Sequence, residues 1–132
     1  MVEAQLKVRT KNFAHDCVKL AIVLPSTDLG RHIGRQLIRS ATSVAANYRA
    51  TCIAQTKRSF ISKLSIVIEE IDESNFWLEF LKEEKVIDST KVGMLINESD
   101  ELTRIFISSR KTAEKNILSE DIVNYEKRKE DD

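Results

Sequence analysis

Basic residues in the first half of the chain have the spacing best suited to chemistry. Arg31, Arg35 and Arg39 recur at every fourth position, which places them on one face of a helix. Guanidinium groups suit phosphate because they donate two parallel hydrogen bonds. Arg31 and Arg35, together with three further cations toward the next turn, give a candidate nucleic-acid-binding set: Arg31, Arg35, Arg49, Lys57 and Arg58.

The two halves of the chain differ in charge although the whole is neutral. Residues 1–60 carry ten Lys or Arg against three Asp or Glu, and residues 61–132 carry eleven against eighteen. This asymmetry has two interpretations. The first half either forms a basic binding face or packs a basic helix beside an acidic one.

An acidic cluster follows at Glu69, Glu70, Asp72 and Glu73. Paired carboxylates can perform acid–base chemistry, but salt bridges to the basic helix are the simpler interpretation. If the intervening turn centres near residues 55–56, Arg39 lies level with this cluster. We therefore expect Arg39 to pair with it, and leave the pairing of Arg31, Arg35 and Arg58 open.

Other chemistry is not indicated by the motifs. His15 and His32 have no Glu-x-x-His or zinc-ligand spacing, and no phosphate-binding glycine loop occurs. Cys17 and Cys52 fall within apolar helical patterns without CxxC spacing, so we expect reduced core thiols, as suits the cytoplasm. The sequence predicts no enzyme, metal, cofactor or small-molecule substrate, and no membrane span or signal peptide.

These residues must be positioned by helices, because 132 residues contain only three Gly and one Pro. Apolar residues at 3/4 spacing predict helices over about 9–24, 29–54, 57–84 and 90–115. Asp28 and Ser89 are candidate N-caps for the second and fourth. The predicted fold is all-α, an antiparallel up-down-up-down four-helix bundle over residues 1–118, with a charged, disordered tail at 119–132.

An aromatic group lies on the third predicted helix. Phe76, Trp77 and Phe80, with their apolar neighbours, point around most of that helix. Either the bundle core is wide there, or part of this surface is an oligomer interface.

Several blocks of the sequence resemble a known family. They are Arg9 to Ala14, Gln36 to Tyr48, Lys63 to Ile66 and Glu70 to Leu78. In order and spacing these blocks resemble the 23S rRNA intervening-sequence proteins, also called four-helix-bundle proteins, over about residues 9–115. The resemblance implies a bundle that assembles into a homopentameric ring, without a settled activity or catalytic residues. Arg39, Asn47, Glu70 and Glu73 match motif positions and are interpreted as structural polar residues between the second and third helices.

Two functions are consistent with these observations. The chain is expected to be a non-enzymatic, cytoplasmic oligomer that binds RNA or a ribonucleoprotein partner. The alternative is a protein-interaction scaffold, in which the ring binds no nucleic acid. Which surface forms the oligomer interface, and which partner binds, are left open.

Overall fold

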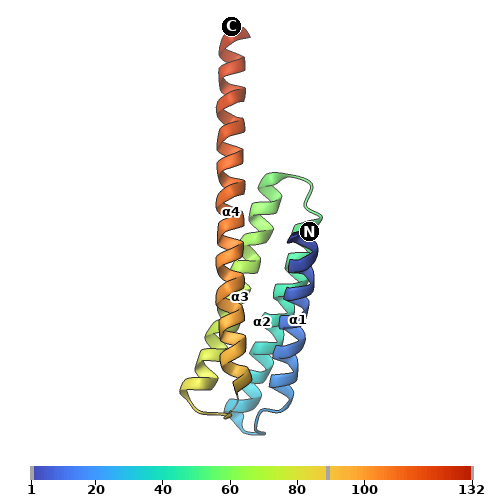
Figure 1. Cartoon of the computed structure of the whole chain (residues 1–132), viewed down its shortest axis with the longest axis vertical. Helices are drawn as coiled ribbons and strands as arrows, with labels where there is room; N and C mark the ends of the chain where they lie inside the picture. Colours follow the sequence, from blue (N-terminus) through green and yellow to red (C-terminus); the bar gives the residue numbers. More distant parts are fainter. Residues whose placement is uncertain (1, 89, 132) are drawn as a thin grey trace.

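The structure, a computed structural model, consists of four helices and describes residues 2–88 and 90–131 (Figure 1). The helices are α1 (Val2–Ile22), α2 (Asp28–Cys52), α3 (Lys57–Glu83) and α4 (Thr90–Asp131). The all-α bundle expected from the apolar spacing is confirmed. No helix in the described ranges is both long enough and apolar enough to span a bilayer.

Consecutive helices pack against one another, and a smaller contact between α1 and α4 closes the bundle. Cross-helix pairs give the direction of packing. Lys57 at the start of α3 pairs with Glu120 late in α4, whereas Asn75 further along α3 donates to Ser99 earlier in α4. These two helices therefore run in opposite directions, and Figure 1 shows the chain reversing at each connection.

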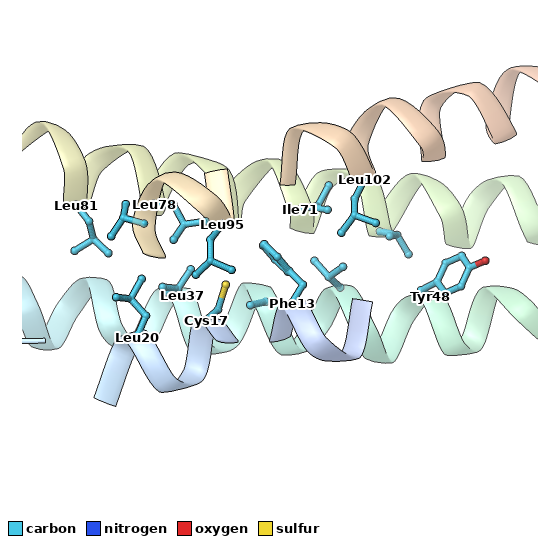
Figure 2. Packing of buried hydrophobic residues seen from close by; sticks show 14 of the residues in the cluster. Phe13, Cys17, Leu20, Leu37, Tyr48, Ile71, Leu78, Leu81, Leu95 and Leu102 are labelled. Atoms are coloured by element: carbon cyan, nitrogen blue, oxygen red, sulfur yellow. The ribbon is translucent and has the colours of Figure 1, made fainter. Parts of the chain in front are cut away.

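The core follows the predicted stripes. Phe13 and Cys17 of α1, Leu37 of α2, Leu78 of α3 and Leu102 of α4 are buried together (Figure 2). Polar positions within the stripes are paired: the Ser74 hydroxyl lies 2.9 Å from that of Ser40 and 3.0 Å from the carbonyl of Glu70. These small serines thus let α2 and α3 approach closely, and no buried serine hydroxyl is left without a hydrogen bond at this contact.

The cap of α2 differs from the prediction. Thr27, not Asp28, is the N-cap, and its hydroxyl accepts a hydrogen bond from the Gly30 amide at 3.0 Å. Asp28 is the first helical residue, where a carboxylate still interacts favourably with the helix dipole. Thr56 caps α3 in the same way. The predicted cap Ser89 lies outside the described residues.

Two helices are longer than predicted. α1 starts at Val2 rather than near Arg9, because Leu6 adds a buried turn. α4 continues through Asp131, so the predicted end near Lys115 was wrong, and residues 119–131 are exposed helical turns rather than a disordered tail. No Gly or Pro interrupts the chain after Gly93, and Glu120 and Asp121 pair with the start of α3.

Candidate nucleic-acid interface

Arg31, Arg35 and Arg49, three of the predicted phosphate-binding residues, share one face of α2. All three are exposed, and they line two depressions that α2 forms with α1. Ile38 and Thr42 occupy the intervening positions of this face. The structure therefore brings these three arginines to one side of the bundle, the α1/α2 face.

Arg31 is held in place at the start of α2. Its guanidinium lies 2.7 Å from Asp28 Oδ1 and donates to the Ser26 carbonyl at 2.8 Å. The side chain remains half exposed, so it is oriented without being withdrawn from solvent. Among the described residues, Arg35 and Arg49 have no ion pair, so their charges face solvent uncompensated.

Lys57 and Arg58 lie elsewhere, at the first turn of α3. Lys57 pairs with Glu120, and Arg58 lies 3.0 Å from Asp121 Oδ2. Both carboxylates belong to α4, 63 residues away in sequence. These cations are therefore partly neutralised and do not join the α1/α2 face.

Three residues to which the sequence analysis gave no binding role complete this face. Lys7, Lys11 and His15 border, with Arg49, a groove of about 820 Å³ between α1 and α2. No carboxylate of the described residues lines it. The floor consists of small or aliphatic side chains: Val8, Ala14, Val18, Thr42, Ala45 and Ala46. The i, i+4, i+8 spacing of Lys7, Lys11 and His15 was visible in the sequence and could have identified them.

Charge is divided between the helix pairs. α1 and α2 carry eight Lys or Arg residues against three Asp or Glu, whereas α3 and α4 carry twelve against fifteen. Arg9 is a cation of α1 that faces α4, where it lies 2.6 Å from Glu98 Oε1. That hydrogen bond raises the pKa of Arg9 above its ordinary value. The net positive charge of the described residues thus lies on α1 and α2. On the α1/α2 face, Lys7 lies 4.0 Å from Glu3 Oε1 and Arg31 pairs with Asp28. By contrast, Arg35 and Arg49 have no ion pair among the described residues.

Of the predicted structural polar residues, Arg39, Glu70 and Glu73 form the expected bridge between α2 and α3. Arg39 Nη1 lies 3.3 Å from Glu70 Oε2, and Nη2 pairs with Glu73. Asn47 does not contribute to this contact: its amide donates to the backbone carbonyl and hydroxyl of Ser43 within α2, at 2.9 and 2.8 Å.

The aromatic group divides into exposed and packed parts. Phe76 is 52% exposed, while Trp77 and Phe80 pack against the core. Trp77 lies edge-on to Phe76 and to His32 of α2, with ring centroids 4.9 and 5.4 Å apart. Its indole nitrogen is buried, with no hydrogen-bond partner among the described residues. Phe76 is thus the residue of this group available to another molecule.

The thiols are protected by the fold. Burial raises the pKa of Cys17 well above its ordinary value, and burial is also the largest cause of the raised pKa of Cys52. Neither is therefore a ready thiolate at neutral pH. Within residues 2–88 and 90–131, no group of three His, Cys, Asp or Glu side chains has metal-binding geometry.

These features define a four-helix bundle with a basic face on α1 and α2. The sequence pattern of the family described as "23S rRNA-intervening sequence protein" matches residues 3–108, and the chain belongs to this family. A crystal structure from Bacteroides thetaiotaomicron VPI-5482, of a protein of unknown function from the S23 ribosomal protein family, is 32% identical. It aligns with 84% of this chain and 99% of its own, with a TM-score of 0.76. No curated protein matches significantly.

Proposed function

We propose that this chain is a non-enzymatic, cytoplasmic protein that assembles into a homopentamer and binds RNA, alone or within a ribonucleoprotein. The observation that carries the proposal is the α1/α2 face, where Arg35 and Arg49 stand on the same side as Lys7 and Lys11, and where the described groove lining holds no carboxylate. Guanidinium and ammonium groups on one surface are the pattern expected for phosphate contacts.

The distribution of charge between the helix pairs supports RNA binding over the alternative in which the basic residues only form salt bridges within the bundle. The carboxylates of α3 and α4 neutralise Arg9, Arg39, Lys57 and Arg58. No carboxylate of the described residues forms an ion pair with Arg35 or Arg49, and the two carboxylates beside this face, Glu3 and Asp28, lie against Lys7 and Arg31. Phosphate contacts at Arg35 and Arg49 therefore displace no ion pair of the described residues. A ring would repeat this face in every subunit and so increase the avidity of weak contacts.

Phe76 supports the assembly part of the proposal. A half-exposed phenylalanine beside Trp77 and Phe80 is the kind of aromatic surface that interfaces bury. Light scattering coupled to size exclusion should report about five chain masses. A monomer at micromolar concentration would contradict the pentamer.

A protein-interaction scaffold is the second candidate. The apolar floor of the groove at Val8, Ala14 and Ala46 favours it, because RNA backbones gain little from aliphatic contacts. A scaffold would bind its partner with a weak dependence on salt.

The test is fluorescence anisotropy with structured rRNA fragments over a range of salt concentrations. Five phosphate contacts, from Lys7, Lys11, Arg31, Arg35 and Arg49, predict that log affinity falls by about 3.5–4.5 per log unit of salt. Arg31→Glu/Arg35→Glu should remove two contacts and lower that slope by about 1.4–1.8.

Lys111→Glu/Lys115→Glu is the matched control, with the same charge change and spacing on exposed turns of α4. It should leave both affinity and slope close to wild type. If the two double variants behave alike, the α1/α2 face is not the RNA site. Binding that neither salt nor Arg31→Glu/Arg35→Glu affects would favour the scaffold.

A further inference from the structure

The groove of the α1/α2 face has an apolar floor, which phosphate contacts alone do not use. Aliphatic side chains of both helices line it, among them Val8, Val18, Ala45 and Ala46. Val8 is 59% exposed. Thr42 is the one hydroxyl among the described lining residues, and it donates to the Ile38 carbonyl at 2.7 Å. The floor therefore offers a ligand van der Waals contact and no free side-chain donor.

The rim of the groove has the spacing of a single row of phosphates. Lys7, Lys11 and His15 follow one another along α1 at every fourth position, a rise of about 6 Å each. This rise is close to the separation of neighbouring phosphates along one nucleic-acid strand. Lys7 lies 4.0 Å from Glu3 Oε1 with both side chains about half exposed, whereas Lys11 has no ion pair among the described residues. The rim is therefore suited to the phosphates of one strand that runs along the groove.

A duplex and an unpaired strand would use this groove differently. In a duplex the faces of the bases are covered by stacking, so a protein reaches only phosphates, sugars and base edges. The aliphatic floor would then lie against a hydrated backbone and gain nothing. An unpaired base exposes a flat face of low polarity, which leaves water when it lies on such a floor. The groove volume of about 820 Å³ is within the usual range of small-molecule sites, about 300–1,000 Å³, and is large enough for a nucleotide.

We propose that the groove binds an unpaired nucleotide, with the face of its base on the aliphatic floor and its neighbouring phosphates at Lys7, Lys11 and Arg49. The exposed His15 ring at the rim offers the base a second flat surface. This inference rests on the proposed RNA binding and specifies the form of RNA that the α1/α2 face prefers, a single-stranded segment. It also gives the apolar floor a role in RNA binding that a phosphate backbone does not.

The first test compares two strands that differ only in their bases. Fluorescence anisotropy with the full-length protein measures the affinity for a short oligouridine and for an abasic ribose–phosphate strand of equal length and charge. The oligouridine should bind about five- to tenfold more tightly. Both affinities should fall as salt rises, but their ratio should stay constant, because salt does not screen an apolar contact.

The outcomes separate this inference from the RNA proposal on which it rests. Equal affinities for the oligouridine and the abasic strand would overturn the inference and leave RNA binding through phosphates intact. Failure to bind either strand or the duplex of oligouridine with oligoadenosine would refute RNA binding, and this inference with it.

The second test removes apolar surface from the floor without changing charge. Val8→Ser/Val18→Ser should reduce the preference for oligouridine over the abasic strand, while the affinities for the abasic strand and for the duplex stay at the wild-type value. Those two affinities also report that the variant is folded. Val23→Ser/Val123→Ser is the matched control, at two exposed valines outside the groove, and should keep the full preference. Equal preferences in the two double variants would overturn the role of the floor.

The third test locates the base on the wild-type protein. An oligouridine with one central 4-thiouridine is irradiated in the complex, and the cross-linked peptides are identified by mass spectrometry. Cross-links are expected within residues 7–18 of α1 or 42–49 of α2, which include the groove lining. Cross-links confined to α3 and α4 would overturn the inference.

Discussion

Replacing Gly30 or Gly93 by alanine should change the stability of the fold in opposite directions. An ideal Cβ at Gly30 would lie 2.1 Å from the backbone oxygen of Pro25 and 3.2 Å from the Thr27 hydroxyl. At Gly93, no described atom outside the local helix backbone lies within 4 Å of the added carbon. Gly→Ala in a helix is favourable by itself, by about 1 kcal/mol. The atoms around each glycine therefore decide whether alanine raises or lowers the free energy of unfolding.

At Gly30 the turn between α1 and α2 must move to admit a methyl group. Overpacking of this kind costs about 1–3 kcal/mol, and disturbing the Thr27 cap adds about 1 kcal/mol. After subtraction of the propensity gain, Gly30→Ala should lower the free energy of unfolding by about 1–3 kcal/mol. Gly93→Ala should raise it by about 0.5–1 kcal/mol.

Urea unfolding followed by circular dichroism measures both values. Gly34→Ala is an internal control, because its Cβ would meet Ala21 O at 3.5 Å, an ordinary contact, and it should not destabilise. Equal stabilities of Gly30→Ala and Gly93→Ala would refute the close approach of Pro25 to α2. The same comparison tests the turn that orients Arg31.

Two further predictions concern charge. The arginine of the Arg39–Glu73 pair is half exposed. A double-mutant cycle of Arg39→Ala with Glu73→Ala should therefore give a coupling free energy under about 1 kcal/mol. A coupling of about 2 kcal/mol or more would contradict the exposed geometry. The raised pKa of buried Cys17, ordinarily 9.0, means that the folded chain keeps a proton that the unfolded chain releases. Stability should therefore be intact below about pH 9 and fall above it, by up to about 1.4 kcal/mol per pH unit for this thiol. In urea unfolding, Cys17→Ala should lose less free energy of unfolding than wild type between about pH 9 and 10. If the free energy of unfolding of the variant falls with pH as steeply as that of wild type, Cys17 is not the cause of the fall.

The helices and their buried sides were largely predictable from the order of residues. Phe13, Cys17, Leu37 and Leu102 belong to stripes of 3/4 spacing, and a helical repeat of about 3.6 residues leaves only one side on which each stripe can lie together. The position of one turn was enough to place Arg39 level with the acidic cluster that contains Glu70 and Glu73. These are short-range consequences of helix geometry, so the sequence alone was enough.

The ends of the helices were less predictable. Thr27 and Asp28 are both good caps, and backbone geometry rather than composition selected Thr27. The charged end of the chain looked like a tail, but Glu120 and Asp121 pair with the start of α3. Those pairs join residues 63 positions apart, a separation at which no local pattern reports a contact.

The basic face was determined by packing. The sequence grouped Arg49 with Lys57 and Arg58, because they are neighbours along the chain. In the structure, α2 presents Arg49 beside the groove that Lys7 and Lys11 of α1 also line, while the start of α3 turns its cations toward α4. The sequence determined which helices carry positive charge. Which of those charges share a surface depended on how the helices pack, because side chains from different helices become neighbours only when their backbones are placed in three dimensions.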